Sequence, residues 1–140
     1  MLVRGKNCRE ILVIIISILL IGMIFYLQCG RDIDVSNSFS EISADFYEEN
    51  ITVIVNRLSV ANKEKCAEEI IKKCRENDFQ SVLFSYDKVK PNALYGTVYL
   101  SRYSMRWKKP LFTFSYIQKS GTSGQYNIVD NPDVFYLEVQ

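Results

Sequence analysis

The chain of 140 residues contains no histidine. Histidine is the commonest general base and metal ligand, so its absence counts against an enzyme that works by ordinary acid–base, metal-dependent or triad chemistry. The sequence also lacks a P-loop, a G-x-G-x-x-G run, a C-x-x-C pair and an H-E-x-x-H motif. We therefore expect no metal site and no cofactor, and we assign no catalytic residue.

Cysteine is scarce in the part of the chain expected to fold. Cys8 and Cys29 flank a long apolar run, which leaves Cys66 and Cys74 in the predicted domain. These two are eight residues apart on a predicted helix. That spacing places them about 12 Å apart along its axis, too far for a disulfide. Both fall on the apolar side of that helix, so we expect small buried hydrophobic residues rather than a reactive pair.

What the chain does contain is one long apolar run near its N-terminus. Residues 11–27 carry no charge, and only Ser17 and Gly22 interrupt their large apolar side chains. As a helix this run would be about 25 Å long, close to the hydrocarbon thickness of a bilayer. The sequence therefore predicts a transmembrane anchor over residues 11–28.

Two alternatives to a retained anchor remain open. A cleaved signal peptide has a shorter apolar region followed by small residues. This run instead ends in the bulky sequence Phe25-Tyr26-Leu27-Gln28. A lipoprotein would be lipidated at Cys29, but a lipobox requires a small residue directly before the cysteine, and Gln28 is not small. The sequence favours the uncleaved anchor over both.

Basic residues lie unevenly around the run, with Arg4, Lys6 and Arg9 before it and only Arg31 soon after it. Positively charged flanks stay on the cytoplasmic side of a membrane. We therefore expect a single-pass protein of the cell membrane, with residues 1–10 as a cytoplasmic flank. The remainder of the chain would be exported.

Beyond the span we expect a polar leader over residues 29–45, followed by one exported domain over residues 46–140. The leader is rich in serine, aspartate and asparagine, which suits a spacer between membrane and domain. Between Asp32 and Glu49 there are six acidic residues and no basic one. An anionic bilayer surface would repel this stretch, so it should stand away from the lipid.

The predicted domain belongs to the α+β class. Across residues 61–76, charged residues separate apolar residues that recur at helical spacing, which predicts an amphipathic helix. Its predicted apolar side consists of Cys66, Ala67, Ile70, Ile71 and Cys74. The predicted strands are residues 51–58, 80–86, 94–103, 111–118, 126–129 and 134–139. We expect the helix to cover one face of a mostly antiparallel meander of about five to six strands, leaving the other face open.

Residues 94–103 are predicted to place Tyr95, Tyr99 and Tyr103 on one side of a strand, with leucine and valine on the other. If the helix covers the leucine side, the tyrosines face outward. Gly96 would then let the helix approach the sheet closely. The sequence does not reveal which side is covered.

Charge is segregated along the domain. Residues 88–119 carry seven basic residues and no acidic one, whereas residues 30–87 carry seven basic and twelve acidic residues. Basic groups beside aromatic rings suit an anionic or sugar-containing surface. The candidate binding surface consists of Tyr95, Tyr99, Arg102, Tyr103, Arg106, Trp107, Lys108 and Lys109.

Three functions remain open for this chain. The first is a non-enzymatic interaction module of the cell envelope that binds a partner, such as another membrane protein. The second is adhesion of the same surface to anionic lipid or a cell-wall polymer. The third is an envelope enzyme without histidine, using tyrosine, carboxylates or Cys66. No nucleic acid is expected as a partner, and no small-molecule ligand is identified.

The tyrosines and basic residues are equally compatible with a purely structural role. The tyrosines would then stabilise the sheet as cross-strand pairs, and the basic residues would keep a hairpin edge soluble.

Overall fold

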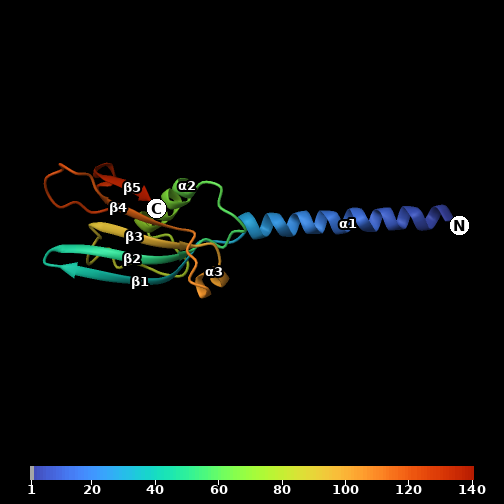
Figure 1. Ribbon diagram of the computed structural model, residues 1–140, viewed down its shortest axis with the longest axis horizontal. Coiled ribbons are helices and arrows are strands. Elements are labelled where there is room, and N and C mark those ends of the chain that lie inside the picture. The colour runs from blue at the N-terminus through green and yellow to red at the C-terminus, as the bar shows by residue number, and fades with distance from the viewer. Residues whose placement is uncertain (1) are drawn as a thin grey trace.

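The computed structural model describes residues 2–140, with side chains from residue 7 onward. Its first element is helix α1 (Leu2–Cys29), which projects as a rod from one end of the folded domain (Figure 1). Its segment Asn7–Cys29 has a mean hydropathy of 2.8, and the most apolar stretch of this segment is not buried against the rest of the protein. By length and composition, α1 is the one described helix able to cross a membrane, in agreement with the predicted anchor.

The domain is built on a five-stranded sheet in the order β1-β2-β3-β4-β5. The strands are β1 (Asp34–Ser43), β2 (Phe46–Ile54), β3 (Ala93–Tyr99), β4 (Phe112–Gln118) and β5 (Phe135–Val139). Neighbouring strands pair antiparallel except β2 and β3, which are parallel because a helix carries the chain across between them. The predicted α+β class, sheet type and strand number are confirmed, although the sheet is not a simple meander.

Helix α2 (Lys63–Glu76) is this crossover, and it packs on one face of the sheet. The Asn62 side chain caps its start by accepting the Lys65 N–H at 3.0 Å. Asn77 ends it in the left-handed conformation, with a φ of 55°. Every residue predicted for its apolar side is buried, namely Cys66, Ala67, Ile70, Ile71 and Cys74.

The face of the sheet that α2 covers is the one carrying Leu94 and Val98 of β3. Tyr95 and Tyr99 therefore lie on the opposite, open face, where they are half-buried. Gly96 points toward the covered side, but the expectation that it admits the helix is wrong. The ring of Phe114 on β4 occupies the space above Gly96, so an added Cβ would overlap that ring.

The expected leader over residues 29–45 is largely wrong, because Asp34–Ser43 forms β1 at the edge of the sheet. The side chains of Ile33, directly before β1, and Val35, near its start, are buried in the core, while most of the remaining strand is exposed. An exposed edge strand needs few apolar side chains, so its serine-rich composition is compatible with pairing. The anchor consequently joins the sheet with almost no spacer.

Residues 80–86 form no strand but a loop that folds back on the end of α2. The Asn77 side chain donates to the Phe84 carbonyl oxygen and accepts the Phe84 N–H, both at 2.8 Å. The Tyr86 hydroxyl donates to the Cys74 carbonyl oxygen at 2.6 Å. These bonds satisfy backbone groups locally, so the alternating aromatic residues pack beside the helix without a partner strand.

Residues 126–129 also form a turn instead of the predicted strand. The Asn127 side-chain oxygen accepts two following backbone N–H groups at 3.1 and 2.8 Å. Ile128 is fully buried, and its carbonyl oxygen accepts a hydrogen bond from Arg75 Nε at 2.9 Å. A short 3-10 turn, η1 (Pro132–Val134), then leads into β5.

Candidate binding surfaces

The structure divides the predicted surface between two regions. The predicted strand over residues 94–103 is too long, since β3 ends at Tyr99 and Tyr103 belongs to the short helix α3 (Arg102–Arg106). Tyr95 and Tyr99 lie on the open face of the sheet, apart from the rest. We call the remaining group the membrane-end patch, which consists of Arg102, Tyr103, Arg106, Trp107, Lys108 and Lys109.

Two serines explain why the strand ends where it does. The Ser101 hydroxyl accepts the Ser104 N–H at 3.2 Å, and the Ser104 hydroxyl accepts the Ser101 N–H at 3.0 Å. This capping box satisfies backbone groups that would otherwise pair with a neighbouring strand. Lys108 closes the far side of α3 in the left-handed conformation, with a φ of 53°. The short helix is therefore held at both ends.

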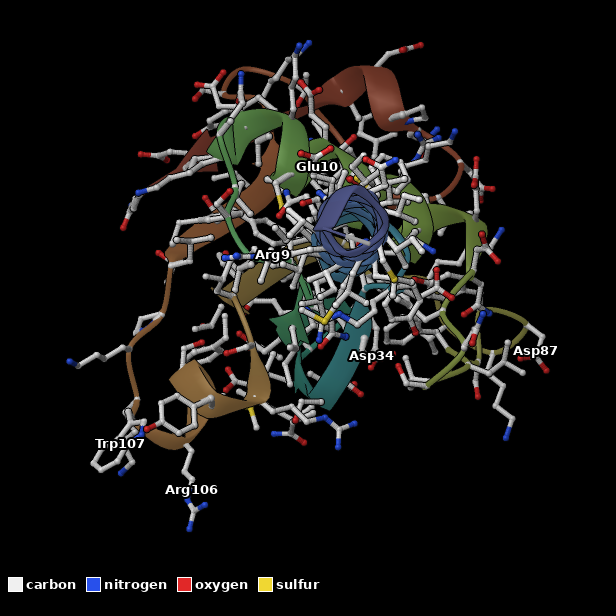
Figure 2. All side chains as sticks on the ribbon, turned by 90° about the vertical axis from the view of Figure 1, so that its right-hand side faces the viewer. Arg9, Glu10, Asp34, Asp87, Arg106 and Trp107 are labelled. Carbon is white, nitrogen blue, oxygen red and sulfur yellow. The ribbon has the colours of Figure 1, made fainter. Side chains whose placement is uncertain are left out.

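Tyr103 and Trp107 form an aromatic pair on the outer side of α3. Their ring centroids are 6.2 Å apart, with the rings inclined at 63°. Tyr103 is 71% exposed and Trp107 is 62% exposed, so neither ring belongs to the core. Viewed along α1 from the anchor side, Arg106 and Trp107 point outward at the edge of the domain, to one side of α1 and away from it (Figure 2). Such a pair is available to contact another surface.

The basic residues of the membrane-end patch are not neutralised within the described part of the chain. The ion pairs among residues 7–140 are Arg57 with Glu69 and Lys90 with Asp130, each at 2.8 Å. None involves the patch, whose basic side chains are all exposed. The patch therefore presents a concentrated positive charge.

The membrane-end patch and the anchor lie at the same end of the domain (Figure 1). The Gln28 side chain, in the last turn of α1, bonds to the backbone of Leu58 and Ser59 over 2.9 to 3.2 Å. The chain also passes from Cys29 into β1 at Asp34 with only a short link. These two connections keep the domain, and thus the patch, close to the end of α1.

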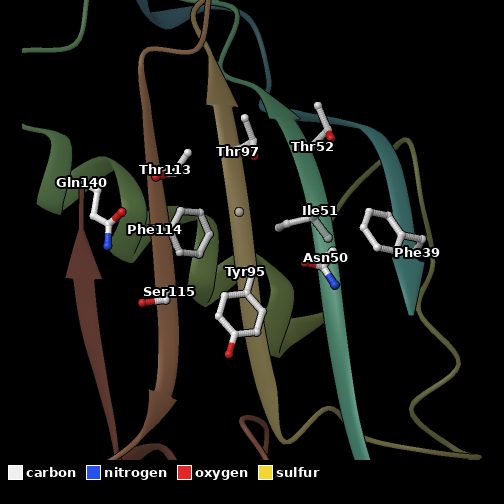
Figure 3. A pocket seen from close by; sticks show the side chains of 11 residues that line it. Phe39, Asn50, Ile51, Thr52, Tyr95, Thr97, Thr113, Phe114, Ser115 and Gln140 are labelled. Carbon is white, nitrogen blue, oxygen red and sulfur yellow. The ribbon is translucent and has the colours of Figure 1, made fainter. Parts of the chain in front are cut away.

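A second surface, which the sequence analysis did not identify, is a groove of about 350 Å³ across the open face of the sheet (Figure 3). Its two borders are rows of cross-strand neighbours, with Thr52, Thr97 and Thr113 in one and Asn50, Tyr95 and Ser115 in the other. Phe39 of β1 also lines it. We call it the open-face groove. Only the pairing register of the strands brings these residues together.

The open face is acidic rather than basic. Its strand positions include Glu41, Glu48 and Glu138, and no lysine or arginine. Partial burial, and then the nearby Glu48 carboxylate, raise the pKa of Tyr95 above its ordinary value of 10.0, so its phenol stays neutral. The predicted combination of tyrosines and basic residues on one sheet face is therefore wrong.

Other reactive groups in the domain are held in structural roles. Burial raises the pKa of the Cys66 and Cys74 thiols, which keeps both protonated in the core. The buried Glu49 carboxylate accepts hydrogen bonds from Ser40 at 2.8 Å and Tyr47 at 2.6 Å. Across the described residues, no three histidine, cysteine or acidic side chains are grouped so as to hold a metal ion.

Comparisons of the chain with protein-family models, with curated proteins and with solved structures found no match. Function is therefore inferred from the geometry and chemistry of the two surfaces.

Proposed function

We propose that this chain is a single-span membrane protein with a cytoplasmic N-terminus and an exported, non-enzymatic binding domain. The domain docks through its membrane-end patch on the anionic headgroups of the bilayer that holds the anchor. The basic flank before the span supports this orientation. The lack of histidine and the two buried thiols support a binding role rather than catalysis.

The observation that carries the proposal is the position of α3 at the anchor end of the domain (Figure 1). A surface at this end meets lipid, whereas a cell-wall polymer or a soluble partner would be met more readily at the far end. The Gln28 contacts limit how far the domain can tilt away from the end of α1. The lipid surface is therefore favoured over the other anionic surfaces considered.

The composition of the patch matches the interface of a bilayer. Tryptophan and tyrosine are enriched at headgroup level because their rings are apolar while their N–H and O–H groups remain hydrated. Each lysine or arginine near an anionic leaflet contributes about 1 kcal/mol of attraction. Because the anchor already holds the domain at the membrane, even weak contacts become effective.

Trp107 is the single tryptophan of the chain, so its fluorescence reports directly on the patch. The full chain would be placed in nanodiscs of phosphatidylcholine alone or mixed with phosphatidylglycerol, with a quencher attached to the headgroups. We expect a blue shift and stronger quenching in the anionic discs, and a loss of both effects at high salt. The double substitution Arg106→Ala and Lys109→Ala should remove the difference between the two lipids.

The matched control is the double substitution Lys88→Ala and Lys119→Ala, which removes the same charge at the far end of the domain. It should leave the quenching unchanged. Quenching that is equal in both lipids, or equal in the two double variants, would show that the patch does not dock on anionic lipid.

A further inference from the structure

The open-face groove is bordered by hydrogen-bonding groups that the protein itself does not use. Elsewhere, asparagine side chains hold loops together, as Asn56, Asn62, Asn77, Asn92 and Asn127 do. In contrast, the six side chains of the two rows form no hydrogen bond with any described residue, although they are only partly exposed. Polar groups collected in one place without internal partners are suited to a ligand that supplies those partners.

The groove is also rigid and of defined width. Its two rows are two residues apart along the strands, which separates them by about 7 Å. Its floor is backbone, since Ile51 and Phe114 direct their side chains toward the α2 side and Gly96, between them, has no side chain. Ladder hydrogen bonds with both neighbours hold the central strand β3 in place. The volume suits about one or two sugar rings.

Aromatic rings complement the hydroxyl and amide groups. Tyr95 stands in the middle of one row, and Phe39, which is 52% exposed, lies across from Asn50 on the edge strand. Rings in this position can pack on the apolar C–H face of a ligand. The groove therefore offers a flat apolar contact beside several donors and acceptors.

Charge narrows the class of ligand. None of the side chains lining the groove carries a formal charge at neutral pH. The charged side chains on the open face include Glu48, whose partner strand is β3, and Glu138, which pairs with Ser115 of β4. Carboxylates at the border repel phosphates, nucleotides and acidic polymers. An uncharged ligand with many hydroxyl groups remains.

We infer that the open-face groove binds a neutral saccharide. The sugar packs a C–H face on Tyr95, and its hydroxyl groups bond to the threonine row and to Asn50. This site is separate from the membrane-end patch, so it does not depend on whether the patch docks on lipid. The sugar would bind on the open face of the sheet, opposite the face that α2 covers.

The full chain in phosphatidylcholine nanodiscs would be titrated with N,N′-diacetylchitobiose, cellobiose and maltose up to about 10 mM, well above a millimolar dissociation constant. Saturation-transfer difference NMR would detect contact with the sugar. We expect at least one of the three to bind, with little dependence on salt. Thr97→Val keeps the shape of the strand and removes one hydroxyl, and Tyr95→Ala removes the ring. Each should weaken binding roughly tenfold, in line with the loss of one well-made contact.

Leu83→Ala is the control, because it removes an exposed apolar side chain outside both the groove and the membrane-end patch and should leave sugar binding unchanged. Thr97→Val also tests the site if Tyr95→Ala fails to fold. The inference is overturned if none of the three sugars binds to the folded chain. Binding that survives in both Tyr95→Ala and Thr97→Val overturns it as well.

Discussion

Gln28, in the last turn of α1, holds Ser59 of the loop before α2 through two hydrogen bonds. Its Nε2 donates to the Ser59 carbonyl oxygen at 2.9 Å, and its Oε1 accepts the Ser59 N–H at 3.2 Å. The same oxygen accepts the Leu58 N–H at 3.0 Å. Because α1 also continues covalently into the link before β1, the domain is attached to α1 at two points. A polar side chain at the end of the apolar run thus orients the domain.

Replacing Gln28 with alanine should loosen this junction without unfolding the domain. Each lost hydrogen bond contributes about 0.5–1.5 kcal/mol, so the amides of Leu58 and Ser59 should exchange with solvent roughly tenfold faster. Hydrogen exchange of the full chain in nanodiscs would measure this effect. Gln125→Ala, which changes an exposed glutamine far from α1, should leave these amides unaffected. Unchanged exchange in Gln28→Ala would show that the contact does not restrain the junction.

The orientation of the chain can be tested with its own cysteine. Cys8 is exposed on α1 and precedes the apolar run, so it should be cytoplasmic. In intact cells, a membrane-impermeant maleimide should not label Cys8 in a Cys29→Ser background. The same reagent should label Ser120→Cys, placed in the exposed turn after β4, and should spare the buried Cys66 and Cys74. Labelling of Cys8 from outside would reverse the proposed topology.

Gly96→Ala should destabilise the domain, because the new methyl group would overlap the ring of Phe114. Overpacking of this kind lowers the free energy of unfolding by about 1–3 kcal/mol. Chemical denaturation of the full chain in micelles would measure it. Adding Phe114→Leu should recover part of the loss, since a smaller side chain leaves room for the methyl group. If Gly96→Ala is as stable as the parent, the ring moves aside without cost.

Alkaline pH should weaken the domain through the buried Cys74 thiol and the partly buried Tyr86 phenol. Burial raises the pKa of the Cys74 thiol and of the Tyr86 phenol above their ordinary values of 9.0 and 10.0. The folded domain then keeps protons that the unfolded chain releases. Their contribution to stability is therefore complete below about pH 9 and declines as the pH rises toward the folded values.

The denaturant concentration at the unfolding midpoint should consequently be lower at about pH 11 than at about pH 8. Tyr86→Phe should reduce this fall, although it costs about 1 kcal/mol at neutral pH by removing the hydrogen bond to Cys74. Tyr103→Phe, at an exposed position, should show the parent's pH dependence. A midpoint independent of pH in the parent chain would contradict the prediction.

The two helices that the sequence predicts depend on local pattern. The apolar run of α1 has no charged interruption, and α2 has an apolar stripe with asparagines at both ends. Hydrogen bonds within a helix join residues near in sequence, so pattern and caps are enough to place it. Strands 80–86 and 126–129 were predicted wrongly because asparagine side chains satisfied the backbone there instead of a neighbouring strand.

The two candidate surfaces also differ in whether their residues are close together in the sequence. The residues of the membrane-end patch are close in sequence, so their charge and aromatic character were visible, although their helix was not. The open-face groove joins Thr52, Thr97 and Thr113 from three strands. No sequence spacing reveals that they form one row.

The sequence by itself determined the apolar helix, the amphipathic helix with its buried cysteines, and the segregation of basic residues between positions 88 and 119. Tertiary structure alone decided that a serine-rich segment pairs as β1, that α2 covers the Leu94 side, and that Tyr95 and Tyr99 lie apart from the membrane-end patch. The physical reason is that pairing register and face selection depend on contacts between distant segments. A polar strand becomes stable only when a neighbour supplies its hydrogen bonds.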